Sequence, residues 1–197
     1  MRKLHRPDPP HQFAENCEMW NQQWTALRSR NPSAQFSWYV VNGVSARDMI
    51  LDVLRDMTKV HCTFCDCFPL SDRSSVPIEH FYPKSHPDHV AKAYDWGNLF
   101  YCCDKCQKSK LERFDPLILK PDDLDYGFSD FFEFDYTTGA ITALAENQRA
   151  TTTIEIYQLD SSERRKYRKK ALRDWTRLFD EDIDDHPYRD YIEGKPL

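Results

Sequence analysis

The sequence has no long apolar run. A helix that crosses a membrane needs roughly 20 consecutive apolar residues, and no segment of the 197 residues approaches that length. The first ten residues, MRKLHRPDPP, are basic but contain no apolar stretch of the kind that forms a signal peptide. We therefore expect a soluble, cytoplasmic protein with reduced thiols and no membrane partner.

Glycine is scarce, with 5 residues, and there is no Gly/Ser-rich linker, internal repeat or low-complexity segment. Hydrophobic residues make up 40% of the chain and aromatic residues 14%, which is enough for a substantial core. We therefore predict one compact unit of the α+β class. It is expected to comprise a helical N-terminal region (1–60), a central core (61–115), and a C-terminal region (116–197) whose hairpin and basic helix pack on that core.

Hydrophobic spacing predicts the secondary structure of this unit. Phe13, Cys17 and Trp20 recur at helical steps near the N-terminus. Ser45 is suited to cap a second helix, because its hydroxyl can accept a hydrogen bond from an unpaired backbone N–H. The expected elements are helices over 10–30, 45–60, 104–113 and 161–180, strands over 76–83, 96–103 and 151–159, and a hairpin over 128–144 that turns at Gly139.

Positive charge is concentrated in one segment of an acidic protein. The net charge is −5, whereas 161–180 carries eight Lys or Arg against three Asp or Glu and is therefore +5, which leaves −10 elsewhere. The helix expected here can lie along nucleic acid, with Tyr167 and Trp175 among its cations. Alternatively it is an ordinary amphipathic helix, with these aromatics, Leu172 and Leu178 packed inward. The acidic run DEDIDD that follows would repel DNA and is suited instead to a protein partner.

Two C-x-x-C pairs carry the clearest chemical signal. Cys62/Cys65 and Cys103/Cys106 have the spacing of zinc knuckles, in which each tight turn presents two thiolates to one metal ion. The alternative is that these are ordinary buried cysteines, but two such pairs in a reducing compartment favour a four-cysteine structural zinc site. The remaining cysteines are expected to be structural, and they are Cys17, Cys67 and Cys102.

The segment from Cys62 to Lys110 resembles the HNH nuclease family, which has a ββα-metal fold often stapled by two such knuckles. The family pattern is an acidic residue and His, a following Pro, an Asn-Leu pair, and C-x-x-C followed by Asn or His and by a Lys three residues later. Several separate motifs agree with it in order. The matching residues are Glu79, His80, Pro83, Asn98, Leu99, Cys103, Cys106, Gln107 and Lys110.

The resemblance implies a role for each residue of the motif. His80 would be the catalytic base that activates water, because a His with its usual pKa of about 6.5 can be neutral at pH 7. Glu79 would hold a catalytic Mg²⁺ or Mn²⁺, and Asn98 would brace the catalytic loop. Each also has a plain structural interpretation, as a half-buried strand residue, a solvated carboxylate and a turn residue. The lysines that would meet phosphates of nucleic acid, or remain solvated, are Lys84, Lys108 and Lys110.

Gln107 departs from the family pattern, which has Asn or His at this position as the second protein ligand to the catalytic metal. Gln offers the same carboxamide oxygen on a stem one methylene longer, so it can still bind a hard cation. We favour Gln107 as this ligand. The alternatives are that Asp104, one helical turn earlier, takes over, or that the site is weakened to a binding module.

Similarity beyond the motif points to a bacterial subfamily of HNH proteins. The segments MRKLHRP, WGNL, LERFDP and FEFDYTTGAI resemble the nuclease subunit of Septu-type anti-phage systems (PtuB-like), which is also found beside some retrons. The resemblance implies a DNA substrate, an ABC-type ATPase partner (PtuA-like) and, in retron systems, a reverse transcriptase with its RNA/DNA product. It predicts a metal-dependent HNH endonuclease, a phosphodiester hydrolase of anti-phage defence.

Two rival functions are compatible with the same residues. A catalytically weak, zinc-stapled module that links nucleic acid to a partner would account for Gln107 and for the acidic balance. A zinc-oxidoreductase-like protein would use the C-x-x-C pairs for thiol chemistry, and zinc content together with thiol accessibility would separate it from the other two.

Overall fold

The computed structural model describes residues 1–70, 77–176 and 182–194. Their helices are α1 (His11–Arg30), α2 (Ala46–Thr58), α3 (Asp104–Lys110), α4 (Phe128–Phe131), α5 (Gln148–Tyr157), α6 (Ser162–Trp175) and α7 (Arg189–Glu193). Their strands are β1 (Val40–Val41), β2 (Val44–Ser45), β3 (Ile78–His80), β4 (Leu99–Tyr101), β5 (Phe132–Asp135) and β6 (Ala140–Ala143).

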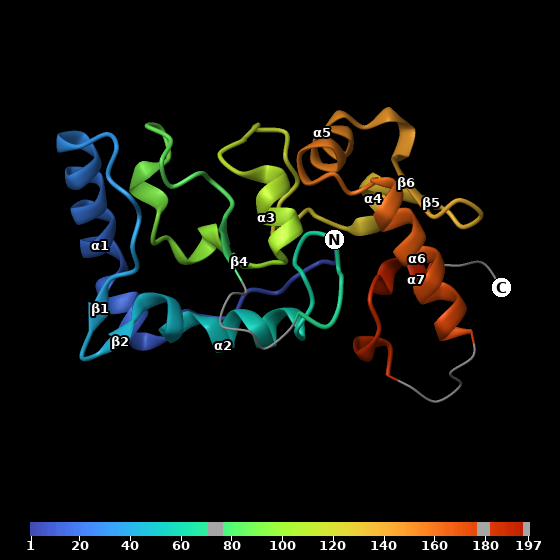
Figure 1. The fold of residues 1–197 in the computed structure, drawn as a ribbon, viewed down its shortest axis with the longest axis horizontal. Coiled ribbons are helices and arrows are strands. Elements are labelled where there is room, and N and C mark those ends of the chain that lie inside the picture. Colours follow the sequence, from blue (N-terminus) through green and yellow to red (C-terminus); the bar gives the residue numbers. More distant parts are fainter. Residues whose placement is uncertain (71–76, 177–181, 195–197) are drawn as a thin grey trace.

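The described residues form a mixed α+β fold in which helices surround two-stranded antiparallel sheets. Figure 1 shows α1, β1 and β2 at one end of the long axis, β4 and α3 near its middle, and α5, α6 and α7 toward the other end. Within the part of the chain that the structure describes, no helix has the length and apolar character needed to cross a membrane.

The N-terminal region is helical, as predicted. Helix α1 buries Phe13, Trp20 and Trp24 on one face, in agreement with the predicted spacing. Helix α2 begins after Ser45, whose hydroxyl oxygen accepts a hydrogen bond from the N–H of Asp48 at 3.1 Å. The predicted N-cap is therefore confirmed.

An antiparallel pair of strands followed by a helix occupies the centre of the chain. Strand β3 pairs with β4 in a register that places His80 opposite Leu99. Strand β4 is shorter than predicted, because Trp96–Asn98 forms a turn of 3-10 helix before it. Helix α3 follows, and the sulfur of Cys103 caps its N-terminus by accepting a hydrogen bond from the N–H of Cys106. The order of elements is the one predicted for this segment.

The C-terminal region contains the predicted hairpin, formed by β5 and β6, but not the strand predicted over 151–159. That strand prediction was wrong, because most of the segment belongs to helix α5. Asn147 caps this helix by accepting a hydrogen bond from the N–H of Ala150. The helix buries Ala150, Thr153 and Ile156 at helical spacing. Packing of this face overrides the preference of β-branched side chains for strands.

The basic helix α6 has a buried and an exposed face. Two of its arginines are buried, whereas its lysines are exposed. Tyr167 is 51% exposed, so the alternative in which it packs inward was wrong for this residue. Leu172 and Trp175 do pack, against a small hydrophobic cluster that includes Tyr191 of α7. Leu178, also expected to pack inward, lies outside the described residues.

The N-terminal segment packs along the centre of the molecule. Met1 and Leu4 are buried. The Arg6 guanidinium donates hydrogen bonds to the backbone carbonyls of Trp96 and Leu99, at 2.8 and 3.0 Å. The MRKLHRP segment therefore supports the start of β4 and the turn before it.

Candidate metal centre and adjoining polar site

Four thiols from two chain segments converge near the start of α3. The sulfur atoms of Cys62, Cys65, Cys67 and Cys103 all lie within 4.8 Å of one another. The sulfurs of Cys65 and Cys103 are 3.7 Å apart, close to the edge of about 3.8 Å in a tetrahedron of sulfurs with Zn–S bonds of about 2.3 Å. A disulfide would need about 2.05 Å. The cluster can therefore hold a metal such as zinc.

Hydrogen bonds within this cluster favour the thiolate form of Cys103 and Cys65, whereas burial raises the pKa of Cys62 and hydrogen bonding with Cys103 raises that of Cys67. The Cys103 N–H donates to the Cys62 sulfur, and the Cys106 N–H donates to the Cys103 sulfur, each at 3.3 Å. Hydrogen bonds from Cys106 and Cys62 lower the pKa of the Cys103 thiol to about 4. Hydrogen bonds from Cys103 and Cys106 also hold the pKa of Cys65 well below its usual value. Thiolate is the form of cysteine that binds zinc.

The compact group of four thiols described above differs by one residue from the zinc ligands expected from the C-x-x-C spacing. It includes Cys67, which was expected to be structural, and not Cys106. The Cys106 sulfur instead accepts a hydrogen bond at 3.2 Å from the Arg164 guanidinium, which is buried. Burial alone would lower the pKa of Arg164, but the neighbouring Cys106 and Cys65 raise it above its usual value. Five thiols thus surround a position that takes four ligands, and Cys62, Cys65 and Cys103 are common to both sets.

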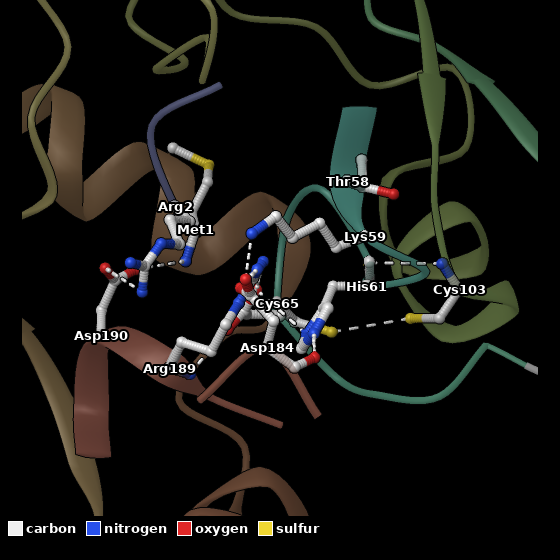
Figure 2. A network of polar contacts seen from close by, with 12 residues as sticks. Met1, Arg2, Thr58, Lys59, His61, Cys65, Cys103, Asp184, Arg189 and Asp190 are labelled. Atoms are coloured by element: carbon white, nitrogen blue, oxygen red, sulfur yellow. Dashed lines mark hydrogen bonds and ion pairs between the residues drawn. The ribbon is translucent and has the colours of Figure 1, made fainter. Parts of the chain in front are cut away.

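A buried ion pair ties the first knuckle to the C-terminal segment. Nη2 of Arg189 lies 2.7 Å from the Asp66 carboxylate, which also accepts a hydrogen bond from the Arg189 N–H at 2.6 Å. The Asp184 carboxylate contacts Arg189 and Lys59, and its backbone carbonyl accepts a hydrogen bond from His61. Figure 2 shows Asp184 between Lys59 and Arg189, close to the cysteine loop. The C-terminal segment is therefore anchored on the loop that carries the first cysteines of the cluster.

His80 is oriented by a hydrogen bond and covered by aromatic rings. Its Nε2 lies 3.0 Å from the carbonyl oxygen of Ala93; because a carbonyl only accepts, Nε2 carries the proton and Nδ1 keeps its lone pair. The indole of Trp38 stacks on the imidazole, and Phe36 meets it edge-on. Burial, with a further contribution from Lys84, lowers the pKa of His80 well below its usual value. The imidazole is therefore neutral at pH 7, with one unprotonated nitrogen of weakened basicity.

Asn98 connects both sides of the loop between β3 and β4. Its side-chain oxygen accepts a hydrogen bond from the Tyr82 N–H at 2.6 Å. Its side-chain nitrogen donates to the carbonyls of Tyr82 and Lys92, at 3.1 and 2.7 Å. Asn98 is 1% exposed, so all of its polar atoms serve the loop backbone. This is the position of a loop brace.

Glu79 faces α3 and is paired with a buried lysine. Its Oε1 lies 2.9 Å from Nζ of Lys110, which also donates to the carbonyl of His80 at 2.9 Å. Lys110 is 0% exposed, so in this structure it lies beneath the surface, where it does not reach a phosphate. Burial raises the pKa of Glu79, although the charge of Lys110 opposes that shift. The Lys110 ammonium, 2.9 Å away, favours the ionised form of the Glu79 carboxyl.

The other residues expected to bind metal or nucleic acid lie around this pair. Gln107 is half-buried on α3, one turn before Lys110. Lys108 is exposed and pairs with Asp104 at 2.5 Å. Lys84 is half-buried, with its Nζ over the ring of Phe36. Glu79 and Gln107 supply the hard oxygen donors that Mg²⁺ or Mn²⁺ prefers, but one carboxylate oxygen is already bound by Lys110.

Comparison with known proteins finds no match: no family model matches the chain, and no curated protein matches it.

Three features of the site have no clear signal in the sequence. These are the Arg164 contact with Cys106, the Asp66–Arg189 ion pair and the cover over His80. Each joins residues that are far apart along the chain, so neither motif spacing nor local periodicity could identify it.

Proposed function

We propose that the protein is a metal-dependent HNH endonuclease that hydrolyses phosphodiester bonds of DNA. In this proposal β3, β4 and α3 form a ββα-metal core, and the cysteine cluster holds a structural zinc ion. The protein would act as the effector nuclease of a bacterial anti-phage defence system, controlled by an ABC-type ATPase subunit. A retron reverse transcriptase with its RNA/DNA product would be a further partner in systems that contain one.

The observation that carries this proposal is the fixed orientation of His80. The Ala93 carbonyl holds the Nε2 proton, while Asn98 ties both sides of the loop that provides this carbonyl. The remaining ring nitrogen carries a free lone pair, although burial weakens its basicity, and its orientation is set before any substrate binds. A general base needs these two properties.

In this proposal, individual residues of the chain have separate roles in the reaction. Nδ1 of His80 accepts the proton of the attacking water, and Asn98 keeps the loop in place as a positioning residue. Phe36 and Trp38 cover the imidazole, so their segment must move for DNA to reach it. Such a movement is a natural point of control by an ATPase partner.

Two metal sites belong to this proposal. Zinc would be held by Cys62, Cys65 and Cys103 with either Cys67 or Cys106, and would join the first knuckle to α3. Glu79 and Gln107 would hold Mg²⁺ or Mn²⁺. This cation supplies charge neutralisation at the scissile phosphate when bound. Because Lys110 binds Oε1 of Glu79, the second carboxylate oxygen is the one left for the cation.

Plasmid cleavage tests the proposal directly. The purified chain is incubated with supercoiled DNA and Mg²⁺ or Mn²⁺, with and without a candidate ABC-type ATPase partner. We expect metal-dependent nicking, and a loss of at least about 100-fold in His80→Ala, because general base catalysis contributes about 10²–10⁴-fold. Gln107→Ala should also lower cleavage strongly if Gln107 holds the catalytic metal.

A matched control is His86→Ala, since His86 is an exposed histidine in the same β3–β4 connection. This variant should keep wild-type cleavage. Equal cleavage by wild type and His80→Ala would show that His80 is not the base. No cleavage from folded, zinc-loaded protein in any mixture would contradict the nuclease proposal.

A second function is favoured by one specific observation. Glu79 and Lys110 form a buried ion pair, which is an arrangement suited to a stable core rather than to a metal site open to substrate. If this pair persists in all states, the protein is a zinc-stapled module that binds nucleic acid or a partner with little or no cleavage. The plasmid experiment separates this function from the first.

A further inference from the structure

One face of α6 presents mainly positively charged side chains to solvent, with the exposed Glu163 one turn before it and the half-buried Asp174 beside Lys170. We call the four exposed residues Lys166, Lys169, Lys170 and Arg173 the basic face. Their spacing of i, i+3, i+4 and i+7 places them side by side on one surface of a helix. At 1.5 Å per residue this face is about 10 Å long, which is enough to meet successive phosphates of a nucleic acid strand.

The charge of this face is only weakly compensated. Lys170 pairs with Asp174 at 2.6 Å, but ion pairs between exposed side chains contribute little. In the described ranges, which stop at 176 and resume at 182, Lys166, Lys169 and Arg173 form no ion pair. Their charges are therefore free to interact with an anionic ligand.

An aromatic hollow lies beside the basic face. It has a volume of about 370 Å³ and is lined by Tyr167, Lys170 and Asp174 of α6 together with Cys67, Phe68 and Tyr188. Tyr167 is 51% exposed, an unusual position for a large ring on a helix that otherwise buries its apolar residues. The volume lies within the range of about 300–1,000 Å³ that is typical of small-ligand sites.

We propose that this surface binds a DNA strand that has at least one unpaired base. The basic face contacts consecutive phosphates, and the hollow takes the unpaired base, which stacks on Tyr167. The inference deepens the function proposed above and takes from it the identity of the ligand as DNA. It assigns the strand-binding surface to α6, at a distance in sequence from His80 and Glu79.

The combination of features favours a single strand over other anionic partners. Bases of a regular duplex are stacked on one another and do not enter a side pocket, whereas unpaired bases stack readily on aromatic side chains. An acidic protein segment would also meet the basic face, but it would fill the hollow only if it carried an aromatic side chain at the matching position, whereas every nucleotide carries a base. A strand with an unpaired base uses both features.

Binding without cleavage provides the test. Fluorescence anisotropy is measured with a labelled strand of about 20 nucleotides and with its duplex, without added Mg²⁺ or Mn²⁺, between about 50 and 200 mM salt. We expect the single strand to bind more tightly than the duplex. Each phosphate contact on a single strand contributes about 0.7 to the slope of log K against log salt. The variant Lys166→Ala/Lys169→Ala/Arg173→Ala should therefore reduce that slope by about 2.

Variants at Tyr167 test the hollow separately. Tyr167→Ala should weaken binding of the single strand by at least about five-fold, because a base stacked on an aromatic side chain contributes at least that much. It should leave the salt slope unchanged, since no charge is removed. Tyr167→Phe keeps the ring and should restore binding. Loss of affinity in the alanine variant for strand and duplex alike would contradict the hollow as a base site.

A charge-matched control excludes a general effect of net charge. Arg30→Ala removes one exposed cation from the end of α1 and should leave the salt slope unchanged, whereas Lys169→Ala should lower it by about 0.7. Equal changes in the two variants would overturn the inference. An absence of DNA binding by the wild type would also overturn the inference. The same holds if the basic face serves only to bind an ATPase partner.

His80→Ala distinguishes this inference from the proposed nuclease. That variant should bind the single strand as the wild type does, because His80 lies outside the basic face and the hollow. Normal binding in a protein that never cleaves would refute the nuclease and leave the α6 surface standing. Cleavage that depends on His80 but not on the basic face or Tyr167 would refute the surface alone.

Discussion

At the scale of single residues, Lys110 and Glu79 form a buried ion pair in the central region. Lys110 is 0% exposed and Glu79 4% exposed, and removing both charges from water is costly. The 2.9 Å contact between them offsets part of that cost, and the hydrogen bond from Lys110 to the His80 carbonyl satisfies a further donor. The charge of each residue therefore offsets part of the desolvation cost of burying the other.

Replacing Lys110 should expose this dependence. Lys110→Met leaves Glu79 buried without a counter-charge, and we expect the free energy of unfolding at pH 7 to fall by about 3–5 kcal/mol. The pKa of Glu79 is already raised by burial, and loss of Lys110 would raise it further. A raised carboxyl pKa means that stability is retained at low pH and lost as pH rises through that pKa. The loss should therefore be smaller at pH 5 than at pH 7, as measured by urea denaturation.

The control is Lys108→Met, at an exposed position on the same helix, which should change stability by less than about 0.5 kcal/mol. The double variant Glu79→Gln/Lys110→Met removes both charges and should recover much of the loss. A double variant as unstable as the single one would show that lost packing, rather than an unpaired carboxylate, is responsible.

At the scale of elements, two glycine turns show how local and tertiary requirements differ. Gly43 joins β1 to β2 and Gly139 joins β5 to β6, and both have positive φ, of 79° and 76°. A Cβ at Gly43 would meet nothing within 4 Å, whereas a Cβ at Gly139 would lie 2.5 Å from the carbonyl oxygen of Arg165. The Gly139 carbonyl also accepts a hydrogen bond from buried Arg168. The second turn is therefore part of the contact between the hairpin and α6.

Alanine at the two turns should separate these requirements. Gly43→Ala should cost about 1–2 kcal/mol, the strain of a left-handed conformation for an L-residue. Gly139→Ala should cost about 1–3 kcal/mol more, because the added methyl overpacks against α6. Urea denaturation of both variants measures the difference. Equal losses would mean that the hairpin can shift away from α6 without cost.

At the scale of the whole molecule, the cysteine cluster connects segments that are otherwise far apart along the chain. Cys62 and Cys65 come from the loop after α2, and Cys103 caps α3. Asp66 in the same loop binds Arg189 of the C-terminal segment, and Arg164 of α6 contacts Cys106. A metal ion in the cluster would therefore hold together the central and C-terminal regions.

Metal removal should loosen the C-terminal segment as well as the knuckles. We expect about one zinc ion per chain by mass spectrometry, since four-coordinate thiolate sites hold a single ion. A chelator, or Cys65→Ser, should lower Tm and speed proteolysis after α6. Cys17→Ser is the control, because Cys17 lies on α1 outside the cluster. Unchanged Tm and protease resistance in metal-free protein would contradict this coupling and favour thiol chemistry.

Local signals in the sequence were sufficient for several parts of the fold and site. Spacing predicted the buried face of α1, Ser45 predicted the cap of α2, and the order of strands and helix in the centre was read correctly. The hairpin of β1 and β2 had a signal that was not used, since Asn42-Gly43 between Val40-Val41 and Val44 is a strong two-residue turn motif. In these cases the determining interactions join residues that are close along the chain.

Other features depended on contacts that only the tertiary structure creates. The segment 151–159 is largely helical because its apolar face packs on the core, and Lys110 is buried because Glu79 lies opposite α3. Cys67 stands in the compact thiol group in place of Cys106, whose sulfur is contacted by Arg164 of α6. The sequence by itself thus determined which residues can bind metal or act as a base. The tertiary structure decided which of these residues face solvent, a metal position or one another. Burial and ion pairing determine this, and the free energy of both depends on neighbours that are distant in sequence.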